Sequence, residues 1–418
     1  MKYIVLILSF ISITVQAQKN KSHQTDGFIE KILISQPELF KEYLAKKDKL
    51  NIQIIYTQIK RNKKGKASFK EDSYQLNPAK YFYPASTVKM PIAFLALEKL
   101  NDLNIPGLDM HTTMITDSAA AKQVHIYTDP TTKDSRPTIA NYIKQIFLVS
   151  DNEAYNRLYE FLGQEYIQRK LTEKGYPNAI IRHRLEVSMN DEQHRATNPV
   201  YFYDTTGKLI YSQPAQISKA VFKPDTVKMG KGYMKNGKLV KEPFDFTTKN
   251  RIYLEDLHNI LKSVLFSESI NKKELFNLKK EDYTFLFRWM SSYPSESKYP
   301  SYDSSEIWDN YVKFLWYGAD KKVPINPSLR IFNKVGDAYG FLIDIAYFAD
   351  IQNNIEFMLS ATIHCNEDEI FNDNKYEYET VGLPFLKKLG LTVHQALLKK
   401  AENNGRIPKK FVLAYQRE

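Results

Sequence analysis

Residues 329–363 read LRIFNKVGDAYGFLIDIAYFADIQNNIEFMLSATI, and this stretch determines the fold that we expect. It predicts three strands, at Leu329 to Asn333, Phe341 to Phe348 and Ile355 to Ile363. Near the other end, Leu50 to Gln58 (LNIQIIYTQ) alternates like a strand, and Ser68 to Gln75 is its expected hairpin partner. The chain between them is mostly helical in pattern. We therefore expect an α+β fold, with an antiparallel sheet built from both chain ends and a helical lobe.

Helical spacing of apolar residues fills most of the middle of the chain. The expected helices cover Phe28 to Lys46, Met90 to Leu100, residues 138–174, Asn250 to Phe266, Tyr283 to Met290 and residues 380–401. We see no repeat and no long low-complexity linker, so one composite domain over residues 18–418 is preferred to two independent ones. Its helical lobe would span about 91–325, with insertions at about 196–246 and 291–326.

The first residues are typical of an export signal. Lys2 gives a positive start, Tyr3 to Val15 form an apolar run, and Val15-Gln16-Ala17 offers small residues for cleavage near Ala17. An uncleaved anchor is the alternative, although the run is short for a bilayer span. Cys365 is the single cysteine of the 418 residues, which excludes an internal disulfide. We expect an exported globular protein, periplasmic or secreted, with the periplasm favoured.

The formal charge of +11 raises the question of an anionic partner. The densest basic run, Lys60 to Lys66, lies between the two N-terminal strand candidates and contains Gly65. A solvated hairpin turn explains it better than a binding patch does. No motif for DNA or RNA recognition accompanies it. We expect no nucleic-acid partner, no membrane span after removal of the signal, and a monomer.

Ser86-Thr87-Val88-Lys89 stands directly before the apolar helix expected over Met90 to Leu100. On a helix, Ser86 and Lys89 lie one turn apart on the same face. A desolvated lysine there can lose its proton near neutral pH and take the proton of the hydroxyl. Ser269 to Lys272 and Ser295 to Lys298 match the same pattern, but neither opens an apolar helix. Ser86 is therefore the candidate nucleophile.

Ser150-Asp151-Asn152 lies close to an expected helix boundary. These residue types also cap helix starts, because their side chains satisfy free N–H groups, so a purely structural interpretation stays open. In the functional interpretation, Ser150 passes a proton to the leaving nitrogen and Asn152 holds the amide of the substrate.

Lys334-Val335-Gly336 follows the strand expected at Leu329 to Asn333. At the end of that strand a cation could face a substrate carboxylate, while Gly336 lets the substrate backbone approach. Lys-x-Gly also occurs at positions 228, 235 and 388, so the triplet is weak evidence by itself. Glu186, within HRLEVSMN at 183–190, would by itself be taken for a solvated surface residue.

Other chemistries lack support in the sequence. There is no His-Glu-x-x-His and no Cys-x-x-Cys, and the eight histidines show no metal-ligand spacing. A Gly-x-Ser-x-Gly elbow and a glycine-rich phosphate loop after a strand are absent too. We therefore expect neither a metal nor a cofactor.

Taken together and in this order, the four groups resemble the penicillin-recognising serine hydrolases, and within them the class A β-lactamases. Ser-x-x-Lys, Ser-Asp-Asn and Lys-Thr-Gly are the recorded motifs of this group. Arg184-Leu185-Glu186 followed by Asn190 is similar to the family loop that carries a deacylating glutamate and a water-holding asparagine. Asn156 falls where the family has an asparagine that tethers this loop.

The resemblance implies a role for each matching residue. Ser86 would attack an amide carbonyl, and Lys89 would take its proton directly or through Glu186 and a water; that choice is disputed for the family. The oxyanion would be held by the backbone N–H of Ser86 and by one near Asp337. Ser150 would protonate the leaving nitrogen. Lys334 would hold substrate charge, and Glu186 with Asn190 would direct water at the acyl-enzyme.

Three departures from the family pattern affect the expected specificity. Val335 stands where the family has Thr or Ser, so a hydroxyl that contacts the substrate carboxylate is missing. A hydrogen bond to a charged group contributes about 1.5–3 kcal/mol, so affinity for penicillins is expected to fall. Val187 replaces the usual proline after the glutamate, and a cis peptide there would cost about 3–4 kcal/mol. The two insertions are expected to reshape the cleft.

Three functions are compatible with the sequence. The first is an exported hydrolase that opens a β-lactam amide through a Ser86 acyl-enzyme. The second uses the same nucleophile on a different amide or ester, such as a wall-peptide fragment, because Val335 and the insertions have changed the pocket. The third is a non-catalytic module that binds peptide or glycan, although such a module has no physical need for Lys89 or Glu186.

Overall fold

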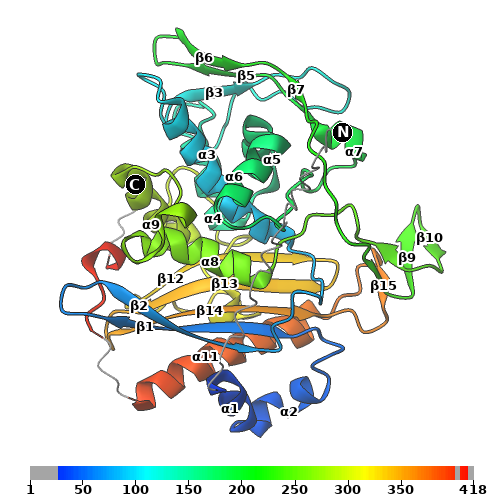
Figure 1. Ribbon diagram of the computed structural model, residues 1–418, viewed down its shortest axis with the longest axis vertical. Coiled ribbons are helices and arrows are strands. Elements are labelled where there is room, and N and C mark those ends of the chain that lie inside the picture. Colours follow the sequence, from blue (N-terminus) through cyan, green and yellow to red (C-terminus); the bar gives the residue numbers. More distant parts are fainter. Residues whose placement is uncertain (1–26, 401–404, 413–418) are drawn as a thin grey trace, which may run out of the picture.

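The computed structural model describes residues 27–400 and 405–412. The expected export signal at 1–17 lies outside the described residues. An antiparallel sheet with the strand order β12-β13-β14-β1-β2 crosses the lower half of the molecule (Figure 1). Its strands are β1 (Gln53–Arg61), β2 (Ala67–Tyr74), β12 (Leu329–Ala338), β13 (Phe341–Asp350) and β14 (Ile355–His364).

The two ends of the chain meet in this sheet, as expected. β1 pairs with β14, and Tyr56 stands opposite Leu359. The long alternating and apolar runs of the sequence therefore become adjacent strands despite some 300 intervening residues. Lys60 to Lys66 includes the β1–β2 turn, in which the backbone N–H of Asn62 donates to the carbonyl of Lys66 at 3.1 Å. The α+β class and the sheet built from both ends are confirmed.

Terminal helices cover one face of the sheet, below it in Figure 1. They are α1 (Phe28–Ile34), α2 (Pro37–Ala45) and α11 (Leu383–Lys400). The short helix α10 (Phe314–Tyr317) lies with them. The single helix expected over Phe28 to Lys46 is wrong, because Pro37 cannot continue the preceding helix and instead starts α2. A five-residue π-helical turn, Tyr378–Gly382, leads into α11. Residue 401, the expected end of the last helix, lies outside the described residues.

The helical lobe packs on the opposite face of the sheet. Its helices are α3 (Lys89–Leu103), α4 (Ile139–Val149), α5 (Asn152–Leu162), α6 (Gln164–Glu173), α7 (Asp191–Arg195), α8 (Leu254–Leu265) and α9 (Lys280–Ser291). Every residue of α3 from Lys89 to Leu100 is buried. Burial on all sides explains why this helix is apolar around its circumference rather than amphipathic. It also means that Lys89 enters the protein interior with an apolar helix.

Short strands accompany the lobe. They are β3 (Thr113–Thr116), β4 (Ala196–Thr197), β5 (Val200–Tyr203), β6 (Leu209–Gln213), β7 (Gln216–Ile217), β8 (Lys228–Met229), β9 (Gly232–Lys235), β10 (Lys238–Val240), β11 (Phe244–Asp245) and β15 (Ile370–Phe371). β3, β5 and β6 form a small sheet at the top of Figure 1, and β10, β9 and β15 form another beside the main sheet. The expected insertion at 196–246 is therefore made of β-structure.

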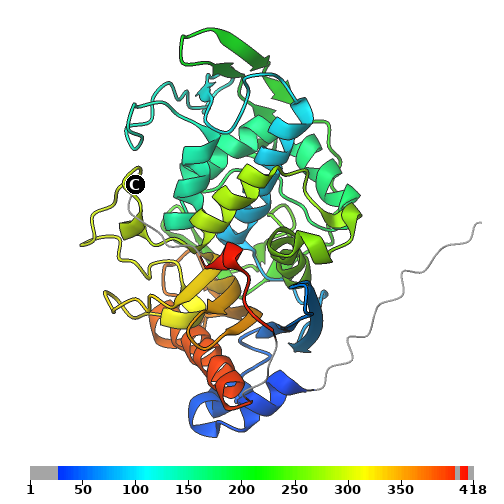
Figure 2. The ribbon, with the colours of Figure 1, turned by 90° about the vertical axis from the view of Figure 1, so that its left-hand side faces the viewer.

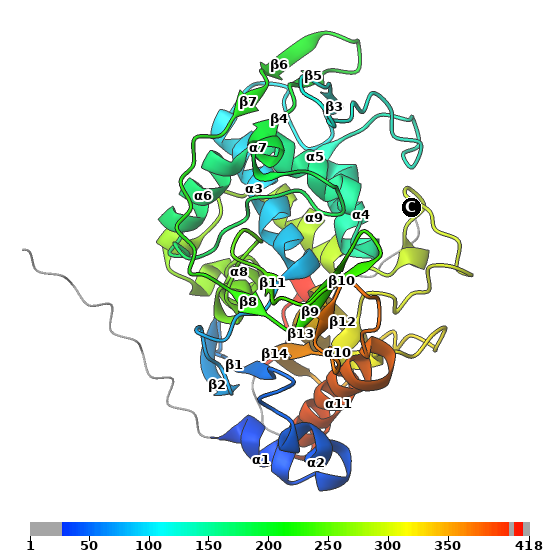
Figure 3. The ribbon, with the colours of Figure 1, turned by 90° about the vertical axis from the view of Figure 1, so that its right-hand side faces the viewer.

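Residues 291–326 have little regular structure. Beyond α10 they contain one 3₁₀ turn, Pro294–Glu296, among the residues that the structure describes. Figures 2 and 3 show this segment (yellow) running along one side of the molecule, where the helical lobe meets the sheet. Its position brings it to the same level as the start of α3 and strand β12.

Candidate active site

The candidate nucleophile lies on a 3₁₀ turn that leads directly into α3. This turn spans Ala85–Val88, and Ser86 is half-buried in it. The preceding residue, Ala85, has φ of 46°, a left-handed conformation that is uncommon for a residue with a side chain. Thr87 Oγ1 donates to the carbonyl of Pro84 at 2.5 Å and fixes the turn from below. The serine is thus held at the N-terminal end of a buried helix with local strain beside it.

Lys89 is fully buried beneath this turn. Its Nζ donates to the carbonyl oxygen of Ser150, to Ser150 Oγ at 3.3 Å and to Asn152 Oδ1 at 2.7 Å. Burial lowers the pKa of Lys89 from 10.5 to about 7, although Asp151, Asp337 and Glu186 oppose that shift. The expected desolvated lysine is present. Within the described chain no hydrogen bond joins it to Ser86 Oγ, because its three N–H groups are used by Ser150 and Asn152.

The junction between α4 and α5 carries the second group of predicted residues. Ser150 ends α4 with φ of 61°, so the chain turns sharply there. Asp151 caps α5, since its Oδ1 accepts from the N–H of Ala154 at 2.8 Å. The structural interpretation of this motif therefore holds for Asp151. The turn leaves the side chains of Ser150 and Asn152 beside Lys89.

Lys334 reaches the same cluster from strand β12. Its side chain is almost fully buried, and Nζ donates to Ser150 Oγ at 2.7 Å and to the carbonyl of Val335 at 2.8 Å. Burial, and then repulsion from Lys89, hold the pKa of Lys334 well below its usual range. The expected place of Lys334 at a strand end is wrong, because β12 continues to Ala338.

Gly336 packs against the nucleophile turn. A Cβ at this position would come within 2.9 Å of the carbonyl oxygen of Pro84 and of the N–H nitrogen of Ser86, and within 3.0 Å of that of Thr87. The glycine therefore makes room for the protein's own backbone, and its expected role in letting a substrate backbone approach stays a prediction. This close approach sets β12 and the Ser86 turn side by side.

Glu186 closes the cluster from a loop between α6 and α7. Its φ is 55°, a left-handed conformation, and its side chain is exposed. Asn152 Nδ2 donates to Glu186 Oε2 at 2.5 Å. A continuous path of hydrogen bonds thus runs from Lys334 through Ser150, Lys89 and Asn152 to Glu186.

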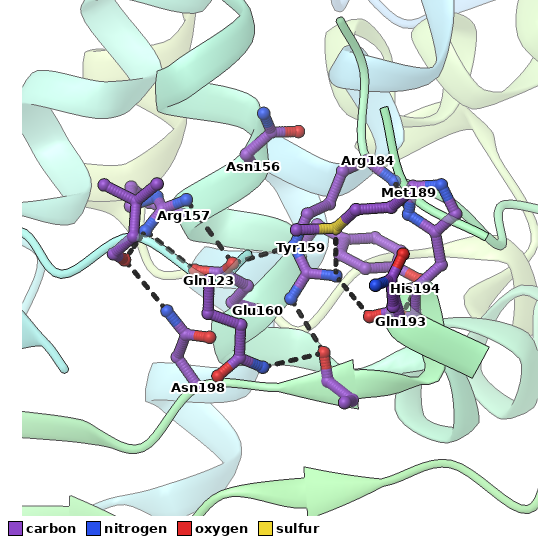
Figure 4. A network of polar contacts seen from close by, with 12 residues as sticks. Gln123, Asn156, Arg157, Tyr159, Glu160, Arg184, Met189, Gln193, His194 and Asn198 are labelled. Carbon is purple, nitrogen blue, oxygen red and sulfur yellow. Dashed lines mark hydrogen bonds and ion pairs between the residues drawn. The ribbon is translucent and has the colours of Figure 1, made fainter. Parts of the chain in front are cut away.

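Buried contacts from α5 hold the loop that carries Glu186 (Figure 4). Asn156 makes two hydrogen bonds with the backbone of Leu185, at 3.0 and 2.9 Å, so the expected tether is confirmed. Arg184 donates to Glu160 at 2.8 Å with both side chains buried. Its other nitrogens reach the carbonyls of Gln193 and Ala196 at the far end of the loop.

Sequence reasoning did not identify Glu160 as part of this support. A signal was present, since Glu160 lies four residues after Asn156 and hence on the same face of α5. Tyr159, on the same helix, donates its hydroxyl to the carbonyls of Arg182 and His194 at 2.8 and 3.1 Å. Helix α5 therefore carries both a site residue and the anchor points of the Glu186 loop.

Two further predicted residues, Asn190 and Asp337, lie near the cluster without a hydrogen bond to it among the described residues. Asn190 Oδ1 accepts from the N–H of Gln193 at 2.9 Å in a capping box that starts α7. Within the described chain it makes no hydrogen bond with Glu186, so its role in holding water stays a prediction. Asp337 has an exposed side chain on the wall of the cavity beside Ser86. The use of a backbone N–H near Asp337 for an oxyanion also stays a prediction.

A cavity of about 810 Å³ opens over the cluster. Ser86, Ser150, Asn152, Glu186 and Val335 all line it. The segment 291–326 supplies much of the opposite wall, including residues at 307, 308, 311 and 312, as expected for an insertion that reshapes the cleft. No described residue of the 196–246 segment lines this cavity.

Residues 27–400 and 405–412 contain neither a metal-ligand cluster nor a helix suited to spanning a membrane. In that part of the chain, no group of three or more His, Cys, Asp or Glu side chains is arranged to hold a metal ion. No helix there has both the length and the apolar character needed to cross a bilayer.

Part of the chain is similar to a known protein family. Residues 38–221, somewhat under half of the chain, match the family model described as "Beta-lactamase enzyme family". The matched region contains Ser86, Lys89, Ser150 and Glu186, but not Lys334. No curated protein sequence matches the chain.

Solved structures with a similar arrangement of elements are also known. A β-lactamase from Sphaerobacter thermophilus has 10% identity, covers 88% of this chain and 96% of its own, and gives a TM-score of 0.46. A β-lactamase from Xanthomonas campestris has 13% identity, with coverage of 89% and 98% and a TM-score of 0.44. PBP-A has 15% identity, with coverage of 90% and 97% and a TM-score of 0.46.

Proposed function

We propose that this protein is an exported serine hydrolase of the class A β-lactamase type, which cleaves an amide or ester through an acyl-enzyme on Ser86. One observation carries the proposal. A continuous hydrogen-bond path from Lys334 to Glu186 lies beside the cavity that Ser86 lines. The path combines two amines, a hydroxyl and a carboxylate beside the candidate nucleophile, and these are the groups needed to move protons during acyl transfer.

In the acylation step, Ser86 Oγ attacks the carbonyl carbon of the substrate and releases its proton to a base. Lys89 is suited to this task because burial lowers its pKa to about 7, so that about half of it is neutral at neutral pH. The neutral amine has a lone pair and needs one hydrogen bond fewer. Glu186, acting through a water, is the alternative base.

Ser150 then supplies the proton that the leaving group needs. Its Oγ contacts both amines, Lys89 at 3.3 Å and Lys334 at 2.7 Å. The proton taken from Ser86 can therefore pass from Lys89 to Ser150 and on to the leaving nitrogen or oxygen. Because its pKa is depressed, Lys334 can donate to Ser150 as a neutral amine. A second full positive charge beside Lys89 is then avoided.

Glu186 acts as the base in the hydrolysis of the acyl-enzyme. Its exposed carboxylate lines the same cavity as Ser86 and accepts from Asn152. From there it can remove a proton from a water that attacks the ester carbonyl. The buried Arg184–Glu160 pair and the Asn156 tether keep its loop in place.

The substrate is either a β-lactam or another amide or ester. A specific observation favours the second candidate. Val335 lines the cavity with apolar methyl groups where the related enzymes offer a hydroxyl to a substrate carboxylate. Residues between 307 and 321 also form part of the cavity wall.

Steady-state assays test the proposal with two chromogenic substrates, a cephalosporin and an uncharged 4-nitrophenyl ester. We expect the Ser86→Ala variant to lose turnover of both. Ser269→Ala is the matched control, because Ser269 belongs to another Ser-x-x-Lys match and lies outside the cavity. Ester turnover without cephalosporin turnover would assign the second candidate substrate. Equal turnover by wild type and Ser86→Ala would refute the proposal. Fractionation with N-terminal sequencing tests export and cleavage near Ala17.

A further inference from the structure

The cavity over Ser86 is lined by acidic side chains, although the chain as a whole carries a formal charge of +11. Its wall contains five carboxylates and one lysine, namely Asp151, Glu153, Glu186, Asp337, Glu379 and Lys321. Four of the carboxylates are exposed and Asp151 is half-buried. The local charge is therefore opposite in sign to the net charge of the protein, so it does not follow from overall composition.

The two site lysines offset only part of this charge: burial raises the pKa of Asp337 by more than Lys334 and Lys89 lower it. Lys89 and Lys334 lie beneath the cavity and are not part of its lining. Burial lowers the pKa of Lys89 to about 7 and holds that of Lys334 well below its usual range. Lys321, on the wall, lies over the ring of Trp308 at 5.1 Å. A ligand in the cavity therefore meets a negative potential.

Two of the carboxylates have no obvious structural role. Asp151 caps α5, Glu153 pairs with Arg157 at 3.6 Å, and Glu186 accepts from Asn152. By contrast, Asp337 and Glu379 make no ion pair or side-chain hydrogen bond within residues 27–400 and 405–412. Unpaired carboxylates on the wall of a site are available to a ligand.

Aromatic rings stand next to these two carboxylates. Tyr311 and Tyr378 line the cavity, and burial, followed by the nearby charge of Asp337, raises the pKa of both phenols. Tyr378 immediately precedes Glu379, and its hydroxyl accepts from the N–H of Gly340 at 2.8 Å. Ring faces together with carboxylates are the surroundings that bind an organic ammonium group. The absence of a metal-ligand grouping among the described residues argues against an inorganic cation here.

We propose that the substrate carries a positively charged group, an amine or quaternary ammonium, which binds between Asp337 and Glu379. This inference rests on the proposed function and names the substrate class of the same site. A substrate carboxylate at this place would meet two like charges and the methyl groups of Val335. Amides or esters of diamino acids have the required chemistry, whereas a β-lactam with only a carboxylate does not.

Labelling of Ser86 by three fluorophosphonates tests the inference. The probes differ only in a tail group, which is trimethylammonium, its uncharged tert-butyl isostere or a carboxylate. We expect the second-order rate constant to fall in that order by roughly 10-fold per step at low salt. The differences should shrink in 1 M KCl, where the Debye length is about 3 Å.

Glu379→Gln and the matched control Glu173→Gln identify the source of the preference. Glu379→Gln should reduce the ratio between the rate constants of the cationic and uncharged probes several-fold. Glu173, an exposed acid on α6 outside this cavity, should have no effect. Equal rates for the three probes would overturn the inference and leave the proposed function standing. No labelling of Ser86 by the uncharged probe would overturn both.

Discussion

The rate of Ser86 acylation should depend on pH with a midpoint near 7. Burial lowers the pKa of Lys89 to about 7, and only the neutral amine can take the proton of Ser86. The active form therefore increases as pH rises through this value. Relative to the plateau, the rate should be about one half at pH 7, about 9% at pH 6 and about 1% at pH 5. The rate increases with pH because the lysine is active in its deprotonated form, and its depressed pKa places this increase near neutral pH.

The burst phase of an uncharged 4-nitrophenyl ester measures this rate in a stopped-flow instrument. The absorbance is read at the isosbestic wavelength of 4-nitrophenol, so that product ionisation does not distort the profile. Glu186→Gln should keep the midpoint if Lys89 is the base. Lys89→Arg keeps the charge but cannot become neutral, so the burst should slow by about 10²–10⁴-fold.

A different profile would refute the assignment of Lys89. A midpoint near 4.3, the usual value for a glutamate, would identify a carboxylate as the base. Loss of that midpoint in Glu186→Gln would then place Glu186 in this step. A rate that is flat between pH 5 and 8 would exclude both groups.

Three other variants test separate parts of the account. Glu186→Gln should slow deacylation by about 10²–10⁴-fold, with acylation changed only a few-fold, so that the acyl-enzyme accumulates in mass spectra. Gly336→Ala should lower the free energy of unfolding by about 1–3 kcal/mol in urea titrations, because its Cβ would press on the backbone of the Ser86 turn. Arg184→Met removes one partner of a buried pair, which typically costs about 3–5 kcal/mol, and should slow deacylation more than acylation while exposing residues 183–196 to proteases.

Each of these variants also has an outcome that contradicts the reasoning. Unchanged turnover in Glu186→Gln would remove the glutamate from the mechanism. Wild-type stability and activity in Gly336→Ala would mean that β12 and the Ser86 turn are not packed as described. If Arg184→Met slowed acylation and deacylation equally, the loop at residues 183–196 would not act on the reaction through Glu186.

The fold was largely predictable because its strands are long and apolar. Residues 341–350 of β13 are all buried, and such a run forms a strand in almost any setting. Errors arose where a single residue decides a boundary. Pro37 splits the first helix, and β12 extends beyond Lys334 because it pairs with β13 over its full length, as far as Ala338 opposite Phe341.

The site was predictable as a set of residues but not as a set of contacts. Ser-x-x-Lys places Lys89 one turn after Ser86, yet its three hydrogen bonds go to Ser150 and Asn152, which are distant in sequence. The same limit applies to Gly336, whose partner is the backbone of the Ser86 turn. The acidic wall of the cavity depends on residues from several segments, and no local pattern indicates that Asp337 and Glu379 line one space.

The most direct test is to map the covalent label on the protein after incubation with the uncharged fluorophosphonate. Peptide mass spectrometry should find the added phosphonyl mass on the peptide that contains Ser86, and Ser86→Ala should remain unlabelled. Label on another serine, or none on native protein, would contradict the claim that Ser86 is the nucleophile of this site.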